Sequence, residues 1–522
     1  GYLVTWAFGH LIQLVNPENY DPALQAWKME TLPIIPEAFK TQIIEQPSSK
    51  RQYEIIAACL MNPAVTEVVC ATDAGREGEL IFRHIYTYSG CKAPIKRLWI
   101  SSQTDQAIKE GFAKLKDGVQ YEPLYHSAIS RSQADWLVGM NATRAYTIAC
   151  SRGQGVMSVG RVQTPVLKMI VDRYRAHVQF KPETFYEITA QFLHPNGEYS
   201  ATWINAKKET RFSKKEDAEA LVTKLKQTTQ GIISQLIQKE KKEKQPLLYD
   251  LTELQRDANK RFKYSADETL KLAQSLYEQH KVLTYPRTSS RYLGKDMVPK
   301  LPELIENLKA QSIYLPFVTQ ILSQKLSPSK RIVDDTKVTD HHAIIPTEKK
   351  ADPGRLNEQE RNIYDLVIRR FLAVFLDECV KDFTEISTEV EKELFRSSGT
   401  VIRTPGWRAV YLENGASDDD EGGLLPSVKE KDTVGIQEMN LREGKTTAPA
   451  LHNEASILSA METAGKQIDD EELREAMKDC GLGTPATRAQ ILERLIQVGY
   501  ITREKNRLLP TFKGEQIIDS IQ

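Results

Sequence analysis

The chain has 522 residues, enough for several domains, and its 40% hydrophobic and 27% charged residues are typical of a globular protein. Basic and acidic residues both number 70, so the sequence lacks the positive excess of a simple nucleic-acid binder. No apolar run approaches the roughly 20 residues of a membrane span, which argues against a membrane protein. The six cysteines are scattered and form no C-x-x-C pair, which argues against a zinc ribbon and fits a reducing cytoplasm. The sequence has no G-x-x-x-x-G-K-[ST] motif, which argues against ATP use.

The first informative pattern lies in residues 1–115, where strand and helix patterns alternate and predict an α/β domain. The apolar run 68–72 and the glycine-containing turn after it predict a buried strand, a tight turn and a helix. Asp73 is then expected at the carboxyl end of the strand and Glu77 at the start of the helix, at the edge where open α/β sheets bind ligands. Two carboxylates with room for water suit Mg²⁺, although both acids could simply favour the helix N-terminus.

Helical patterns follow this region. Residues 95–102 predict another strand, and Thr104 is expected to cap a helix. Residues 120–178 predict helices, in which Arg131 and Asp135 lie one turn apart. On spacing alone, that pair predicts only an exposed salt bridge worth a few tenths of a kcal/mol.

Strand patterns appear in two separated stretches. Residues 182–236 predict strands with a turn at 195–197, and the lysine-rich run 239–244 after them predicts a solvated linker. Residues 380–435 again predict strands, interrupted by an acidic loop at 417–423. The sequence therefore predicts a β-rich domain split around a helical insert.

The insert carries a tyrosine in an unusual setting. A capping box at 265–268 starts a helix with one apolar face, which leads into the loop 284–292. Tyr285 in this loop belongs to a residue type that forms covalent intermediates, and Arg287, two residues on, can bind a phosphate and favour the phenolate. An attack by Tyr285 on a phosphodiester is one interpretation, and an ordinary turn with exposed arginines is the other.

From residue 450 the patterns are helical again. Pro485 is well placed as a first helical residue after a Thr484 cap. Two short apolar runs around a turn at 505–506 then predict a β-hairpin. A helix followed by a hairpin suggests a winged-helix-like element, or else a generic α+β corner.

Three further motifs complete the picture. They are S-V-G-R-V-Q-T-P at 158–165, D-H-H-A-I-I-P-T at 340–347 and G-L-G-T-P-A-T-R at 481–488. Together with the acidic turn and the Tyr285 loop, they make five matches in the order found in type IA DNA topoisomerases. The chain resembles that family, and within it the bacterial topoisomerase III branch.

The resemblance implies a multidomain fold of α/β plus α+β type that closes into a toroid. Its parts would be a Toprim domain (1–115), a helical and winged-helix-like DNA-binding domain in two pieces (116–180 and 441–522), a β-rich arch in two pieces (181–245 and 380–440), and the helical domain with the active-site tyrosine (246–379).

It also implies an ATP-independent reaction. Tyr285 would cleave single-stranded DNA through a 5′-phosphotyrosine link, with strand passage and rejoining to follow. Arg287 would hold the phosphate, His341 would donate a hydrogen bond, and Asp73 and Glu77 would hold Mg²⁺. The implied DNA contacts are Ser158, Val159, Gly160, Arg161, Val162, Gln163, Trp27, His10, Arg131, Asp135 and Arg144. The expected partner is single-stranded DNA, or DNA with single-stranded regions, bound by a monomer that could also work with a helicase.

Three departures from the family pattern lead to alternatives. The family begins with an earlier strand whose Glu-Lys-Pro segment supplies a metal ligand, so we expect the present sequence to be truncated at its N-terminus. Gly75 occupies the position of a frequent second aspartate, and Ser289 that of another common aspartate. A catalytically impaired relative that only binds single strands, and a different Toprim protein such as a nuclease, are therefore the alternative functions.

Overall fold

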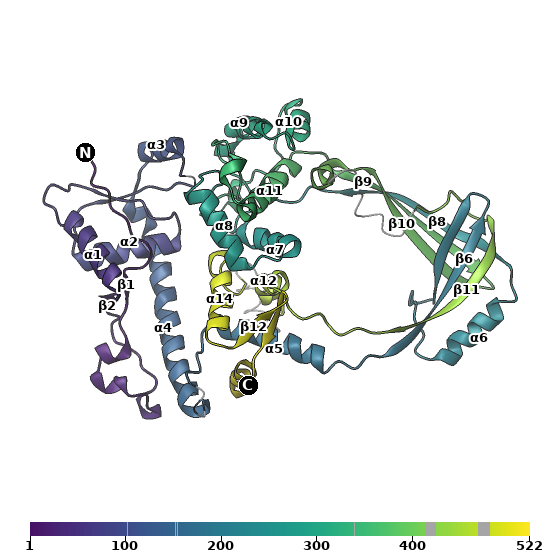
Figure 1. Cartoon of the computed structure of the whole chain (residues 1–522), viewed down its shortest axis with the longest axis horizontal. Helices are drawn as coiled ribbons and strands as arrows, with labels where there is room; N and C mark the ends of the chain where they lie inside the picture. The colour runs from purple at the N-terminus through teal and green to yellow at the C-terminus, as the bar shows by residue number, and fades with distance from the viewer. Residues whose placement is uncertain are drawn as a thin grey trace.

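The computed structural model describes residues 1–522 except 102, 152, 154, 339, 413–423, 468–480 and 522. The fold is mixed α/β with several separate sheets. Figure 1 shows an N-terminal unit at one end, a helical middle that also contains the C-terminus, and a β-barrel at the other end. None of the helices in the described part is both long and apolar enough to cross a membrane.

The N-terminal unit contains the predicted strand, turn and helix. Its three-stranded sheet has the order β3-β4-β5, with β3 and β4 parallel. Thr104 caps α3 as predicted, because its hydroxyl accepts a hydrogen bond from the Ala107 amide at 3.3 Å. The elements are β1 (Ile12–Leu14), β2 (Thr41–Ile43), α1 (Pro47–Leu60), β3 (Val68–Cys70), α2 (Arg76–Ser89), β4 (Ile95–Arg97), α3 (Asp105–Ala113) and β5 (Lys116–Asp117).

Two helices follow where one helical stretch was predicted. They are α4 (Glu122–Cys150) and α5 (Gln163–Val178). The predicted helix over 120–178 is wrong between them, since the chain leaves the helical conformation around Gly153 and Gly155, whose φ angles are 82° and 83°. This interruption forms the loop that carries the motif at 158–163.

The barrel closes six strands in the order β10-β7-β6-β11-β8-β9. Its two sequence segments are the two predicted strand regions, and aromatic residues such as Phe192 and Phe395 fill its interior. The strands are β6 (Thr184–His194), β7 (Gly197–Ile204), β8 (Gln230–Glu243), β9 (Cys379–Val390), β10 (Glu393–Thr404) and β11 (Thr433–Lys445).

Two details of the strand prediction were wrong. The region 182–236 includes a helix, α6 (Lys215–Leu225), which buries Ala218, Val222 and Leu225 at helical spacing. The lysine-rich run 239–244 is not a linker, because all but its last residue continue β8 and pair with β9.

The physical reason lies in cross-strand pairs on an exposed ribbon. Lys241 lies with its Nζ 3.5 Å from the Phe383 ring centroid, and Lys381 pairs with Glu243 at 3.0 Å. Charge alone therefore did not prevent strand formation. The predicted acidic loop 417–423 lies outside the described residues.

The helical insert, residues 246–378, is called the central body below. The predicted capping box is confirmed, with Ser265 and Glu268 bonded reciprocally, and the apolar face of the following helix is buried in the body. Its helices are α7 (Leu251–Phe262), α8 (Ala266–Glu278), α9 (Leu301–Asn307), α10 (Leu315–Leu322) and α11 (Glu358–Ala373).

The C-terminal segment packs against α5 around a shared apolar cluster. Pro485 is the first residue of its helix after Thr484, and the hairpin turns at 505–506, both as predicted. The elements are α12 (Glu454–Glu462), α14 (Pro485–Gln497), β12 (Ile501–Glu504), β13 (Arg507–Pro510) and α15 (Phe512–Ile521). Residues 1–178 and 450–521 together are called the framework.

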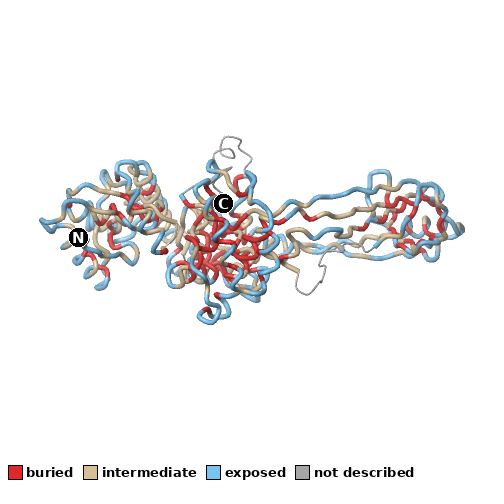
Figure 2. Tube along the Cα trace, turned by 90° about the horizontal axis from the view of Figure 1, so that it is seen from above, coloured by how far each residue is buried: buried red, intermediate tan, exposed pale blue. Residues whose placement is uncertain are grey.

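The connections between these parts have a simple logic. The chain enters and leaves the central body only through the barrel, from β8 into α7 and from α11 into β9. The barrel in turn joins the framework through residues 179–183 and 446–449. Figure 2 shows buried residues gathered in the middle and in the barrel, with mostly exposed or half-buried strands between them. Every other link between body and framework is noncovalent.

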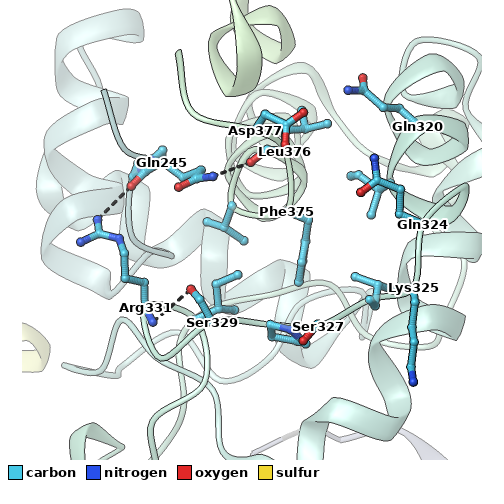
Figure 3. A pocket seen from close by; sticks show the side chains of 16 residues that line it. Gln245, Gln320, Gln324, Lys325, Ser327, Ser329, Arg331, Phe375, Leu376 and Asp377 are labelled. Carbon is cyan, nitrogen blue, oxygen red and sulfur yellow. Dashed lines mark hydrogen bonds between the residues drawn. The ribbon is translucent and has the colours of Figure 1, made fainter. Parts of the chain in front are cut away.

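A cavity of about 340 Å³ lies at the joint of body and barrel. Gln245 and residues 374–377 line it, and the Gln245 amide donates to the Leu376 carbonyl at 2.6 Å across the two connections (Figure 3). The cavity is therefore a feature of the joint, and none of the predicted catalytic residues lines it.

Candidate active site

Tyr285 lies where the central body meets the framework. Its amide donates to the Ser101 carbonyl at 2.9 Å, and the preceding Thr284 amide donates to the Ile345 carbonyl at 3.0 Å. The loop is thus held between a framework segment and the body segment that carries His341. The Tyr285 hydroxyl donates to Asp73 Oδ2 at 3.1 Å, so the predicted nucleophile and the first acid of the turn are in direct contact.

The environment keeps the Tyr285 hydroxyl protonated. Burial raises the pKa of this phenol well above its ordinary value, the Asp73 charge raises it further, and the Arg287 charge lowers it in part. Arg287 is half-buried and forms no hydrogen bond or ion pair with any described residue. The site therefore combines a neutral phenol, an acceptor for its proton and an unpaired cation.

His341 packs beside Tyr285, with ring centroids 4.4 Å apart. Its Nε2 contacts the Ala74 carbonyl oxygen, and its Nδ1 lies 2.9 Å from Ser101 Oγ. A carbonyl can only accept, so Nε2 carries the proton and the serine hydroxyl donates to Nδ1. Burial lowers the pKa of His341 to about 4, which leaves the imidazole neutral at physiological pH.

Asp73 occupies the predicted position after β3, and a buried arginine fixes the backbone there. Arg97 in β4 is 1% exposed and donates to the carbonyl oxygens of Cys70, Thr72 and Asp73, the last at 2.6 Å. Its Nε lies 3.1 Å from the buried Glu79 carboxylate, which compensates its charge.

Gly78 is required by the same turn. A Cβ at this position would lie 2.0 Å from the Asp73 carbonyl oxygen. At Gly75, by contrast, a Cβ would meet nothing within 4 Å. The two glycines of the turn therefore differ: one permits a close backbone approach and the other leaves open space between the two acids.

Glu77 begins the helix on the solvent side of the turn. His10 donates to its carboxylate at 3.2 Å, and the two side chains are 40% and 55% exposed. This hydrogen bond, with contributions from the charges of Arg131 and Arg76, lowers the pKa of Glu77. No group of three or more acidic, histidine or cysteine side chains that could hold a metal occurs among the described residues.

Two arginines share one aspartate beside this acidic turn. Arg161 lies 2.9 Å from Asp135, and Arg131 lies 3.7 Å from it. Since Arg131 also acts on Glu77, the cluster adjoins the turn. Its two cations and one anion leave one positive charge in excess.

The predicted motif at 158–163 forms a well-held loop. The Gln163 side-chain amide donates to Ser158 Oγ at 3.0 Å. The Val159 backbone amide donates to Thr143 Oγ1 at 3.0 Å, and the Gly160 backbone amide donates to Thr164 Oγ1 at 3.1 Å. Val162 is the residue before α5. The loop therefore presents Arg161 from a fixed backbone.

Trp27 and Arg144 lie together. The Arg144 guanidinium is buried, donates to the Leu24 carbonyl at 2.6 Å and lies 5.2 Å from the Trp27 ring centroid. Trp27 itself is 40% exposed. A direct contact of Arg144 with a phosphate would require the segment around Leu24 to move, whereas Trp27 is accessible as it stands.

Sequence reasoning missed four residues that shape the site. They are Glu79, Arg97, Trp99 and Ser101. The available signal was an arginine inside a strand-like run, K-R-L-W-I, where an unpaired charge would be costly. That signal could have identified Arg97 as a buried, compensated cation, but not the carbonyl groups that it contacts.

Comparison with known proteins points in one direction. Residues 119–522 match a protein family described as DNA topoisomerase. DNA topoisomerase 3 of Bacillus cereus is 44% identical over 530 residues, covering 100% of this chain and 71% of that protein, and DNA topoisomerase 3 of Bacillus subtilis is 42% identical over 526 residues with the same coverage. The structure of full-length topoisomerase I from Thermotoga maritima matches with a TM-score of 0.72 at 20% identity, covering 98% of this chain and 78% of that one.

Proposed function

The chain belongs to the DNA topoisomerase family as a type IA enzyme similar to topoisomerase III, and we propose that Tyr285 is its nucleophile. The observation that carries this proposal is the hydrogen bond from the Tyr285 hydroxyl to Asp73, formed between residues 212 positions apart. The phenolic oxygen forms a bond to phosphorus and the bond from phosphorus to the 3′ oxygen breaks. The phenolic proton leaves toward Asp73, and the 3′ oxygen takes up a proton to become a hydroxyl. The reverse reaction rejoins the strand.

Two body residues would assist this attack. Arg287 has no partner among the described residues, so its guanidinium is available to bind the phosphate and to favour the phenolate that develops. His341 is neutral and packs on the Tyr285 ring, which orients the phenol. Its only N–H donates to Ala74, so donation to a phosphate oxygen would require that contact to be exchanged.

Asp73 and Glu77 would hold Mg²⁺. Their oxygen donors fit this ion, which needs only one or two carboxylates and keeps several waters. When bound, the ion would supply Lewis-acid stabilisation of charge near the 3′ hydroxyl during rejoining. Its binding would replace the present partners of the two acids, the Tyr285 hydroxyl and His10.

Single-stranded DNA would follow the framework toward Tyr285. The cluster of Arg131, Asp135 and Arg161 adjoins the acidic turn and would contact phosphates, together with His10 and the fixed loop 158–163. The exposed Trp27 ring could stack on a base, with Arg144 beneath it as support.

The domain division follows the same proposal. Residues 1–115 would form the Toprim domain, 181–245 with 380–440 the arch, 246–379 the tyrosine domain, and 116–180 with 441–522 the second helical domain, enclosing a toroid. Strand passage requires the cut ends to separate. The central body suits this movement, because its only covalent links lead through the barrel. We propose that the enzyme works as a monomer in a reducing cytoplasm, where its five described cysteines stay free, and that a helicase could supply its single strands.

A denaturing assay tests the proposal. A single-stranded oligonucleotide labelled at its 3′ end is incubated with the protein, and the denatured mixture is separated by size. The wild type should yield labelled protein, because the 5′ phosphate of the labelled fragment stays on tyrosine, and Tyr285→Phe should yield none. Tyr292→Phe, in the same loop but with its hydroxyl beside Lys337, is the matched control and should retain the adduct. An adduct that persists in Tyr285→Phe, or cutting without any adduct, would contradict the proposal.

A further inference from the structure

Trp99 reaches from the framework to the residues that flank the nucleophile. It lies two residues after β4, and its indole Nε1 donates to the Asp340 carbonyl oxygen at 3.0 Å. Its ring is nearly parallel to the His341 ring, with an interplanar angle of 14° and centroids 6.2 Å apart. One framework side chain therefore contacts both the backbone before His341 and the imidazole itself.

We propose that Trp99 is a positioning residue, which holds His341 against Tyr285 only while the central body is docked on the framework. The inference rests on the proposed function, because it assigns to Trp99 a role in orienting the attacking phenol. It concerns a residue that does not touch Tyr285 and acts through the imidazole.

The first step of the argument is that Trp99 is itself well fixed. Its ring stacks on Tyr121 at 4.9 Å and 22°, and the Arg97 guanidinium lies 5.1 Å from its centroid. Arg97 cannot shift freely, because it is fully buried and bonded to the backbone of the acidic turn. The indole is thus held by the same arginine that fixes the backbone of Asp73.

The second step is that His341 depends on the framework for its orientation. Its two ring nitrogens contact Ala74 and Ser101, and its ring lies against Trp99. All three of these partners belong to the framework, while His341 and Tyr285 belong to the central body. Separation of body and framework would therefore remove all three contacts at once.

These two steps give the stacked indole a chemical consequence. In the docked state the imidazole is buried and its ring centroid lies 4.4 Å from that of the phenol, so the phenol has few alternative orientations. In the separated state the imidazole is free to rotate and the phenol loses this support. The attacking geometry would then exist only when the acidic turn is also in place, which confines cleavage to the closed enzyme.

The test uses Trp99→Leu, which removes the stacking ring and the N–H, and Trp99→Phe, which keeps a ring and removes only the N–H. Trp407→Phe is the matched control, since its Nε1 also donates to a backbone carbonyl, that of Glu243 at 3.1 Å, but near the joint with the barrel. Adduct formation is measured in a single turnover with saturating 3′-labelled single-stranded oligonucleotide. Affinity for the same oligonucleotide is measured with each variant combined with Tyr285→Phe.

We expect Trp99→Leu to slow adduct formation by up to about a hundredfold, the loss that a misplacement of a reacting group by about 1 Å can cause. Trp99→Phe should recover part of that loss, and Trp407→Phe should behave as the wild type. Affinity should stay unchanged in all three variants, which a merely structural role of Trp99 would not allow. The thermal midpoint of Trp99→Leu should fall slightly, because the stacking on Tyr121 is lost.

Two outcomes would overturn the inference: Trp99→Leu cleaving at the wild-type rate, or a loss of rate in both Trp99 variants that is accompanied by a loss of affinity by the same factor. If Trp99→Leu does not fold, a wild-type rate in Trp99→Phe together with an unshifted Trp407→Phe would overturn it as well. An adduct in Tyr285→Phe alone would instead refute the proposed nucleophile, so the two failures are distinguishable.

Discussion

Apart from the Lys300–Glu110 ion pair, the main contacts between the central body and the framework fall into two seams that differ in character. The catalytic seam comprises the contacts of Tyr285, Asp340 and His341 with framework residues 73–101. The C-terminal seam comprises the contacts of α7 and the start of α8 with residues 454–506. In the C-terminal seam the Glu454 carboxylate accepts from the Ala266 amide at 2.5 Å.

Solvent access is the main difference between the seams. On the catalytic side, Asp73 and Glu77 are exposed although Tyr285 and His341 are buried. Most polar partners of the C-terminal seam are buried. Thr252 and Arg488 lie 2.9 Å apart, Asn259 bonds the half-buried Asn506 at 2.8 Å, and Glu454 is 2% exposed, whereas the Arg256–Glu462 ion pair is partly exposed.

Neither seam is an apolar core. Among the described residues, the central body contributes only Ala266 to the apolar cluster that α5 shares with the C-terminal helices. The apolar core of the body consists of the body's own residues together with Val410. Polar contacts lose little net free energy when both partners return to water, whereas separated apolar surfaces lose the full hydrophobic term. The docked arrangement of body and framework is therefore specified by hydrogen bonds that a moving body can exchange for water. The catalytic seam contains the reacting groups, and the C-terminal seam aligns the body on the framework.

The largest effect is expected from the glycines of the catalytic seam. Gly78→Ala places a methyl group 2.0 Å from the Asp73 carbonyl oxygen, so the turn must shift, at a cost of about 1–3 kcal/mol for overpacking. Adduct formation should fall with it, because Asp73 faces Tyr285. Gly75→Ala is the control and should leave both properties nearly unchanged. Urea unfolding and the single-turnover assay measure the two effects.

One result would contradict the different roles assigned to Gly75 and Gly78. If Gly75→Ala and Gly78→Ala destabilise the protein equally, the turn is not held by the close approach of residue 78 to the Asp73 backbone. The backbone contacts of Arg97 would then have to account for the geometry of the turn.

The turn also illustrates what the sequence could reveal. Its strand, glycines and acids follow local rules, as do the capping box at 265–268 and the hairpin at 505–506, and these elements were predicted from neighbouring residues alone. The lysine-rich run in β8 was mispredicted because its partner strand, β9, lies more than 130 positions away in the chain. Local patterns contain no information about such partners.

The same limit applies to the candidate site. Motif resemblance named Tyr285, His341 and Asp73, and the structure brings them together. It could not name Arg97 or Trp99, whose roles depend on carbonyl oxygens and a ring contributed by other segments. A backbone acceptor has no sequence signature, since every residue has one.

A smaller effect is expected in the C-terminal seam. Glu454→Ala leaves the buried Ala266 amide without its acceptor, which should lower the free energy of unfolding by about 1–3 kcal/mol. Removal of the buried carboxylate also removes its own cost of burial, which reduces this loss. Arg503 keeps a partner in Glu493 at 2.5 Å, so its charge stays compensated. Hydrogen exchange at the start of α8 should accelerate, while the single-turnover cleavage rate changes less than it does in Gly78→Ala.

The pH dependence of this seam has a definite sign. Burial raises the pKa of Glu454, against the opposing effects of the Ala266 amide and Arg503. A raised folded-state pKa means that the contribution of this group to stability is fully present below the unfolded value and is lost as pH rises through the folded value. The stability difference between wild type and Glu454→Ala should therefore shrink as pH rises from about 4.5 toward neutrality. A difference that grows over this range would contradict the assignment.

The smallest effect is expected at the solvent edge of the catalytic seam. His10→Ala removes the hydrogen bond to Glu77, but both side chains are partly exposed, so stability should change by less than about 1 kcal/mol. The lowered pKa of Glu77 means that this contribution is present above its unfolded value and is lost as pH falls through the folded one. Urea unfolding should therefore distinguish wild type from variant near neutrality, and the difference should shrink as pH falls below the ordinary glutamate pKa of about 4.3. A metal ion can easily replace so weak a partner, as the proposed exchange of His10 for Mg²⁺ at Glu77 requires. A loss of several kcal/mol in the free energy of unfolding of His10→Ala would show instead that the contact is structural.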